Sequence, residues 1–282
     1  MTIDVHSDDV GATAAVTEQT LDCWRQGVLT GFSVLANGEA LGRLATVLSE
    51  EAGRGVRIAC HLNLSEGPSS APAADVPLLV DRQGHLRHTF GSLILTWLRA
   101  RGELTRQVET EWQAQVAALQ ARLSPRSVHA VDGHMHVHML PFLFPAAARV
   151  AAASRVRSIR MAREPLYLAS PRWPVINLVK WAVLRFCSGF AEPFARRAGL
   201  TWPDRLVGIL YSGHMTVEAA WAGLAAARRE GARHVEVVFH VGRAAEAETG
   251  RWQGREFMAE FYRSEWRDRE LQEAARLKAR LG

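Results

Sequence analysis

The stretch Asp132-Gly-His-Met-His-Val-His-Met-Leu-Pro141 places three histidines at alternate positions, directly after an acidic residue. Alternate side chains of a β-strand point to the same face, so an extended run would present His134, His136 and His138 together. Imidazoles gathered on one face suit a metal ion or a polar substrate better than a hydrophobic core. The alternative is a surface histidine cluster, but the apolar residues 139–148 favour a buried strand end. We therefore expect the chain to build a site around this run.

The length and composition are those of a globular protein. The chain has 282 residues, of which 48% are apolar and 22% charged, and we interpret residues 1–282 as a single domain. The net charge of +5 suits an anionic partner, but no nucleic-acid-binding motif occurs, so we expect no nucleic-acid partner. The N-terminus lacks the pattern of a signal peptide, and no run of about 18 apolar residues occurs. Together with three scattered cysteines, these features predict a cytoplasmic protein with reduced thiols.

Strand-like and helix-like segments alternate along the chain. Strands are expected within 2–6, 27–36, 55–64, 128–131, 156–161, 204–211 and 235–240, and helices within 14–26, 38–53, 91–101, 103–123, 141–153 and after Thr216. Repeated strand–helix units predict an α/β fold of the (β/α) barrel kind, in which functional residues gather at the carboxyl ends of the strands. Four expected strands end in such residues, namely Asp8 with Asp9, His61, Asp132 with His134, and His240. Their occurrence at four separate strand ends is stronger evidence for a functional site than any one of these residues alone.

Two adjacent carboxylates, Asp8 and Asp9, follow the first expected strand. Neighbouring like charges are unfavourable unless a cation or a function compensates for them. Aspartate is also a favoured helix N-cap, and a helix is expected over 14–26. The two interpretations are compatible, because one aspartate can cap the helix while the other binds a ligand.

Residues 172–199 stand apart because they mix apolar and basic side chains. The segment is too interrupted to span a bilayer, and its composition suits an interfacial helix or a lipid-lined groove. The alternatives are a buried helical hairpin and a contact between two copies of the chain. The tail, 253–282, is expected to be a charged helix with a structural role.

One aspartate and two histidines are a common ligand set for a divalent metal that keeps open positions for water. A second carboxylate beside such a site can act as a general base, and a further histidine can protonate the leaving group. These groups suit the hydrolysis of an amide or an ester. The sequence contains no nucleophile elbow, phosphate-binding loop or dinucleotide fingerprint that would indicate another chemistry.

The chain resembles the YdjC-like carbohydrate deacetylases in four motifs, which occur in order along nearly its whole length. They are Ser7-Asp-Asp-Val-Gly11, Ala59-Cys-His-Leu62, Asp132 to Pro141, and Phe239-His-Val241. Three further segments are similar to the hopanoid-biosynthesis branch of this family: Arg160-Met-Ala-Arg-Glu-Pro165, Asp204-Arg-Leu-Val-Gly208 and Ser212-Gly-His-Met-Thr216.

The resemblance implies a distorted, incomplete (β/α) barrel that removes acetyl groups from N-acetylated amino sugars. By position, Asp9, His61 and His134 would hold one divalent metal ion, either Zn²⁺ or Mg²⁺. Asp8 would be the catalytic base and His240 the catalytic acid. The other polar residues of the motifs would orient the ligands or face the substrate: Asp132, His136, His138 and Arg160.

The sequence departs from the family pattern at His6, Val10 and Val241, where the family favours Asn, Phe and Pro. None of these is a ligand, so we expect activity with an altered pocket shape. In the hopanoid branch the sugar is attached to a lipid, so residues 172–199 are expected to meet a hopanoid or polyprenyl-phosphate carrier at the inner face of the membrane. The alternatives are a soluble chito-oligosaccharide deacetylase and a metal-binding protein without turnover, and a homodimer is compatible with each.

Overall fold

The computed structural model describes residues 1–169, 175–252 and 256–282. At its centre lies a sheet of seven parallel strands in the order β5-β4-β3-β2-β1-β7-β6. The strands are β1 Thr2–Val10, β2 Gly31–Val34, β3 Arg57–Leu62, β4 Ala130–Gly133, β5 Ser158–Ile159, β6 Arg205–Val207 and β7 His234–Phe239. The edge strands β5 and β6 are the shortest, with two and three residues. The sheet curls into a half-barrel, which confirms the predicted α/β fold and incomplete (β/α) barrel.

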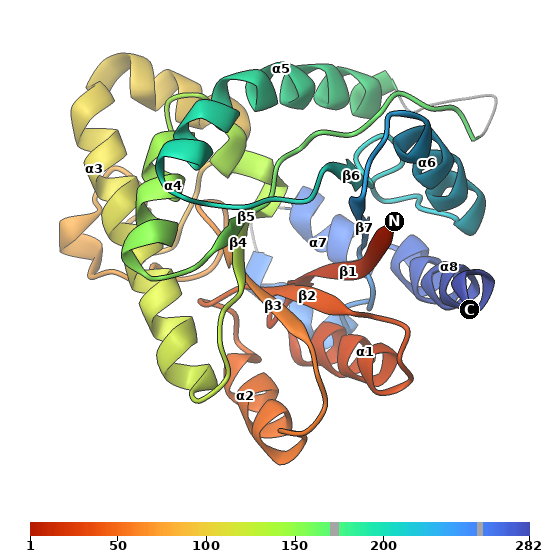
Figure 1. The fold of residues 1–282 in the computed structure, drawn as a ribbon. Coiled ribbons are helices and arrows are strands. Elements are labelled where there is room, and N and C mark those ends of the chain that lie inside the picture. The colour runs from red at the N-terminus through yellow and green to blue at the C-terminus, as the bar shows by residue number, and fades with distance from the viewer. Residues whose placement is uncertain (170–174, 253–255) are drawn as a thin grey trace.

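Helices surround the sheet (Figure 1). They are α1 Ala14–Arg25, α2 Leu41–Glu50, α3 Phe90–Leu123, α4 Phe144–Ala153, α5 Val175–Arg197, α6 Val217–Arg229, α7 Glu256–Arg263 and α8 Glu265–Leu281, with short 3₁₀ helices η1 Ala73–Asp75, η2 His134–Met139 and η3 Glu246–Trp252. Because helices cover both faces, residues 4–10 of the central strand β1 are all buried.

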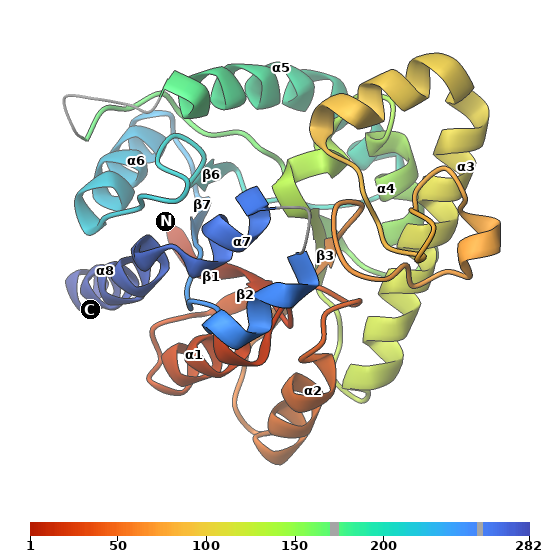
Figure 2. The ribbon, with the colours of Figure 1, turned by 180° about the vertical axis from the view of Figure 1, so that it is seen from behind.

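The C-terminal part of the chain returns to its beginning. β7 pairs with β1, and seen from behind, α7 lies over the middle of the sheet beside β1 and β2 (Figure 2). Met258 and Tyr262 of α7 pack in one apolar cluster with Ala12 and Leu35, which follow β1 and β2. This packing brings α7 and α8 to the carboxyl ends of the strands.

The two helices predicted over 91–101 and 103–123 are both present within α3, where non-helical backbone at Ala100 (φ −145°, ψ 52°) separates them by a kink. Trp112 and Val116 are fully buried, as the amphipathic spacing predicts. Thr216 caps α6 by accepting a hydrogen bond from a backbone N–H of the first turn, which confirms the predicted start of that helix.

The apolar segment predicted over 172–199 is a single helix, α5; residues 172–174 lie outside the described residues. Many of its apolar side chains are exposed: Val175, Ile176, Val179, Val183, Phe186, Phe190 and Phe194. The interpretation as a buried hairpin is therefore wrong, because one uninterrupted helix lies at the surface. In the described part of the chain, no helix combines the length and apolar composition that crossing a bilayer requires.

The tail contains two helices instead of the single helix predicted over 253–282, of which 253–255 lie outside the described residues. Ser264 separates them because its backbone is non-helical (φ −57°, ψ 130°), and its side chain caps α8.

Candidate active site

Asp8 and Asp9 line the same cavity although they are adjacent in a strand. Consecutive strand residues ordinarily point to opposite faces. Here the register of β1 against β2 shifts between Ser7 and Val10, and Asp9 has a left-handed backbone (φ 68°). This irregularity turns the Asp9 carboxylate so that it faces the same cavity as the Asp8 carboxylate. Thr13 is the N-cap of α1, so neither aspartate caps that helix.

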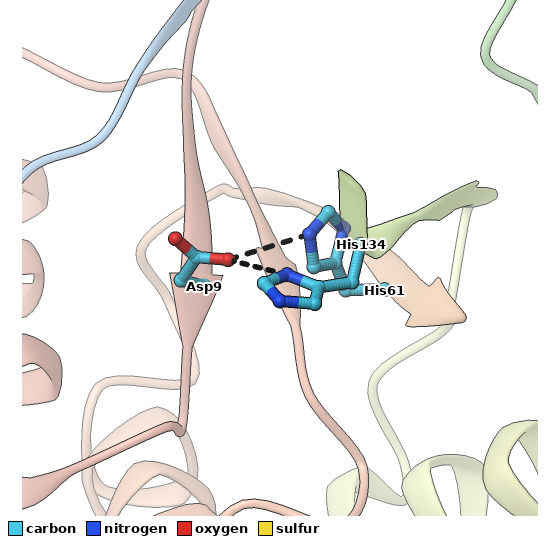
Figure 3. A group of neighbouring side chains, drawn as sticks. All are labelled: Asp9, His61 and His134. Atoms are coloured by element: carbon cyan, nitrogen blue, oxygen red, sulfur yellow. Dashed lines mark hydrogen bonds and ion pairs between the residues drawn. The ribbon is translucent and has the colours of Figure 1, made fainter. Parts of the chain in front are cut away.

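Asp9, His61 and His134 come from the ends of β1, β3 and β4 and converge (Figure 3). Asp9 Oδ1 lies 3.0 Å from His134 Nδ1 and 3.5 Å from His61 Nε2. All three residues are buried. Ligand atoms held by one ion at about 2.0–2.2 Å lie about 3.0–3.5 Å from one another. The spacing and the donor types of this group therefore fit a shared metal ion.

Asp132 lies behind His61. Its Oδ1 is 2.7 Å from His61 Nδ1, so it accepts a hydrogen bond there and leaves Nε2 facing Asp9. Burial alone would lower the pKa of His61, but the carboxylates of Asp132 and Asp8 raise that pKa to about 10. A metal ion binds neutral imidazole, so His61 would have to lose a proton in order to hold an ion here.

Metal binding is therefore expected to release about one proton per ion at neutral pH. A raised pKa keeps His61 protonated in the metal-free protein, so the affinity for the ion should rise with pH below that pKa, by up to about tenfold per pH unit. Calorimetric titration in buffers of different ionisation enthalpy measures the number of protons released. An affinity that is constant with pH, with no proton released, contradicts this picture of His61.

Arg160 lies behind Asp8 and is not among the residues that line the cavity. Its side chain is 2% exposed and donates to both Asp8 oxygens at 2.8 and 2.9 Å. It also pairs with Asp132 at 2.9 Å and Glu236 at 2.6 Å. Burial raises the pKa of Asp8, but the Arg160 guanidinium outweighs burial and holds that pKa well below its usual range. Asp8 is therefore ionised and fixed in orientation. Of the two roles expected for Arg160, orienting a site residue or facing the substrate, these contacts fit the first.

A second buried group, His6 with Asp8 and Asp132, also has ligand-type atoms close together. The Arg160 guanidinium already pairs with both of its carboxylates. His6 Nε2 is hydrogen-bonded to Ser33 Oγ at 2.7 Å. The negative charge of this group is thus matched by a guanidinium, so the group of Asp9, His61 and His134 fits a metal ion better.

The histidine run is not extended, so the prediction of three imidazoles on one strand face is wrong. β4 ends at Gly133, and the run turns at Met135 and His136, which have left-handed backbones (φ 53° and 55°). His136 lines the cavity with His134. His138 is fully buried away from the cavity, and its Nε2 donates to the Arg160 carbonyl at 3.0 Å. A Cβ at position 133 would collide with the His138 ring, so the turn requires glycine there.

The C-terminal helix α8 reaches the site through two buried charged residues, contrary to the structural role expected of the tail. Arg267 donates from Nη1 to Asp9 Oδ2 at 3.1 Å and from Nε to the Gly242 carbonyl at 2.6 Å. Glu270 accepts the backbone N–H of His240 at 2.6 Å, and the same oxygen lies 3.7 Å from His240 Nδ1. The tail therefore positions both Asp9 and His240.

Glu66 is a further neighbour of the ligands. Its Oε1 lies 3.3 Å from His134 Nε2 and accepts a hydrogen bond from the Tyr262 hydroxyl at 2.7 Å. This carboxylate supports the His134 ring on the side away from Asp9. It follows β3 in a loop, and no pattern in the sequence marks it.

Arg267 and Glu270 do have a signal in the sequence. Together with Ala274 and Leu277 they form one buried stripe of α8, at the three- and four-residue spacing of a helix face. Charged residues on an otherwise buried stripe need buried partners. Such a stripe predicts that this face of the tail meets polar groups inside the protein.

Arg267→Met is expected to weaken metal binding by about 10–100-fold, the usual effect of removing a partner that orients a ligand. The variant removes the cation that holds Asp9 Oδ2. Arg269→Met, at an exposed position of the same helix, is the matched control and should bind metal as the wild type does. Equal affinities for the two variants, measured by titration with Zn²⁺, contradict the positioning role.

The cavity that these residues line has a volume of about 470 Å³, within the range of about 300–1,000 Å³ common for small-molecule sites. Its polar lining consists of Asp8, Asp9, His61, His134, His136, Lys180, Ser212 and His240. Its larger apolar side chains are Met135, Ile176, Phe257, Met258 and Phe261. The candidate ligand set thus opens into a space that suits a small molecule with polar and apolar parts.

A family model described as YdjC-like protein matches residues 2–276. The chain belongs to the YdjC-like family. Relatives of this YdjC-like chain include carbohydrate deacetylases from Mus musculus, 30% identical over 79% of this chain and 71% of that protein, and from Homo sapiens, 29% identical over 80% and 68%. A chitooligosaccharide deacetylase of Salmonella schwarzengrund is 29% identical over 52% of this chain and 54% of its own length.

The same fold occurs in the crystal structure of a protein from Enterococcus faecalis V583. It superimposes on this YdjC-like chain with a TM-score of 0.66, covering 97% of this chain and 94% of the other at 19% sequence identity. These findings confirm the predicted family and fold. Membership of the hopanoid branch stays a prediction.

Proposed function

We propose that this YdjC-like protein is a metal-dependent hydrolase that removes the acetyl group from an N-acetylated amino sugar. The observation that carries the proposal is the convergence of a buried Asp9–His61–His134 ligand set with Asp8 and His240 in one cavity. The names of the relatives, carbohydrate deacetylase and chitooligosaccharide deacetylase, support the substrate class.

In this proposal Asp9, His61 and His134 hold one divalent ion. Such an ion polarises a carbonyl group and lowers the pKa of water. Imidazole donors favour Zn²⁺, whereas the carboxylate suits Mg²⁺ as well. Loading the metal-free protein with each ion separately, and measuring turnover, identifies the working metal.

The proton transfers are assigned to Asp8 and His240. Asp8, kept ionised by Arg160, accepts a proton from the water that attacks the acetyl carbon. His240 gives a proton to the amide nitrogen as the carbon–nitrogen bond breaks, so that acetate and the free amine leave. Glu270 holds the backbone of His240 in place for this step.

The other predicted residues take separate places in the proposed mechanism. His136 lines the cavity and faces the substrate. Asp132 orients His61, and Arg160 orients Asp8. His138 supports the chain behind the turn through its bond to the Arg160 carbonyl.

An apolar space next to the cavity supports a lipid-linked substrate. It has a volume of about 330 Å³ and is lined by Phe90, Met135, Ile176, Val179, Lys180, Val183 and Leu184. Three of these residues, Met135, Ile176 and Lys180, also line the site cavity. A sugar can therefore present its acetamide to the ligands while an attached hopanoid or polyprenyl-phosphate chain lies along α5. In this proposal, exposed apolar residues of α5 contact the inner face of the membrane.

The double variant Val179→Ser, Val183→Ser is expected to lower the preference for a lipid-linked over a free acetylated sugar by about tenfold, because it removes apolar contacts along α5. The measurement is the ratio of kcat/KM for N-acetylglucosamine carried on a lipid and for a free chito-oligosaccharide. Trp221→Ser, at an exposed apolar position of α6, is the control. An unchanged ratio favours the alternative function, a soluble chito-oligosaccharide deacetylase. The exposed face of α5 would then be better explained by a contact between two copies of the chain.

A further inference from the structure

Lys180 occupies the junction between the site cavity and the apolar space along α5, because it lines both. The residue is half-buried. Among residues 1–169, 175–252 and 256–282, no carboxylate forms an ion pair with its ammonium group. Burial lowers the pKa of Lys180, while Glu164, Asp8 and Asp9 oppose that shift from a distance. The amine therefore has lost part of its hydration without gaining a close anionic partner.

The other cations around the site differ from Lys180 in this respect. Arg160 is saturated by Asp8, Asp132 and Glu236. Arg267 is paired with Asp9. Both guanidiniums are buried and hold catalytic-site carboxylates in place. Of these three cations in the described part of the chain, Lys180 is therefore the one that can meet a ligand.

We propose that Lys180 binds a negatively charged group, a phosphate or a carboxylate, attached to the acetylated sugar. This inference rests on the proposed function and narrows its substrate class to anionic amino sugars. A lysine ammonium offers three donors on a flexible stem, which suits an oxyanion of either kind. Because Lys180 lies between the two spaces, the charged group would lie between the acetamide and any apolar part of the substrate.

The test compares three acetylated sugars that differ in charge: N-acetylglucosamine methyl glycoside, N-acetylglucosamine 1-phosphate and N-acetylmuramic acid. For each, kcat/KM is measured with the metal-loaded wild type, Lys180→Met and Lys180→Arg. Lys278→Met is a matched control, because 180 and 278 are the two lysines among 34 basic residues. We expect the wild type to prefer an anionic sugar over the neutral one, and Lys180→Met to reduce that preference about 10–100-fold.

Lys180→Arg should keep most of the preference, since it keeps the charge, and Lys278→Met should keep all of it. A preference for the phosphate over the carboxylate, or the reverse, identifies the charged group. If Lys180→Met lowers kcat/KM equally for all three sugars, or if the wild type shows no preference, the inference is wrong. Equal losses would assign Lys180 to offsetting the charge of the site carboxylates.

A binding measurement separates this inference from the proposed function. Glucosamine 1-phosphate and glucosamine, which carry no acetyl group, are titrated calorimetrically into the wild type and Lys180→Met. Binding of the phosphate that depends on Lys180, in a protein that releases no acetate, supports the inference and contradicts the proposed function. Acetate release without any Lys180-dependent preference supports the proposed function and overturns the inference.

Discussion

Asp8→Asn is expected to lower kcat by about 10²–10⁴-fold, the usual contribution of a general base, while the protein keeps its metal. The substitution removes the acceptor of the proton but none of the three ligand residues. Arg160 loses its ion pair with residue 8 but keeps its ion pairs with Asp132 and Glu236, so the fold should persist. Metal content and circular dichroism, measured beside kcat, check both statements.

The matched control is Asp22→Asn. Asp22 also pairs with an arginine, Arg25 at 3.1 Å, but on the exposed face of α1, where such pairs contribute little. Its kcat should equal that of the wild type. If Asp8→Asn keeps wild-type activity, Asp8 is not the general base, and the proposed mechanism is wrong at this step.

His134→Ala is expected to abolish both metal binding and turnover. It removes one of three ligands, so its effect on metal affinity should exceed the roughly 10–100-fold loss that removal of an outer partner causes. His134 also contacts Asp9 at 3.0 Å and Glu66 at 3.3 Å. The variant therefore removes one contact from each of these two buried carboxylates. Metal content by elemental analysis and acetate release by coupled assay measure the two losses.

His85→Ala serves as the control, because His85 is exposed and lies outside the cavity lining. It should bind metal and turn over as the wild type does. A His134→Ala variant that is folded and still binds one ion per chain with wild-type affinity would move the metal away from the Asp9 group.

The convergence of site residues could be predicted because it follows from topology. Parallel strands bring their carboxyl ends to one edge of a sheet, so residues at the ends of different strands meet whatever their separation in sequence. Asp9, His61 and His134 do converge in this way. The strand periodicity and the order of elements were enough to expect this, and the resemblance to a family added the individual roles.

The conformation of the histidine run could not be predicted, because it depends on tertiary contacts. Its sequence alternates as a strand does, yet Met135 and His136 adopt left-handed backbones. Gly133 and His138 pack too closely for a side chain at position 133, which fixes the turn. Such a close approach between a backbone and a ring is a property of the fold, and local patterns do not report it.

The stripe of α8 indicates that Arg267 and Glu270 meet buried polar groups, but the identity of those groups could not be predicted from the sequence. Arg267 contacts Asp9 across 258 residues of chain, and no local spacing links the two. A charged helix ordinarily faces solvent, so the composition of α8 alone does not indicate its buried face. The exposure of α5 had a different cause: its apolar residues resemble core residues in composition, and only the packing shows which of them remain at the surface.

The measurement that tests the central claim most directly is acetate release from acetylated amino sugars by the metal-loaded protein, with and without a chelator. The substrates are N-acetylglucosamine on a lipid carrier, a free chito-oligosaccharide and the charged sugars described above. The account predicts release that the chelator abolishes and that Zn²⁺ or Mg²⁺ restores. No release from any of these sugars, or release that continues unchanged in the fully metal-free protein, would contradict it.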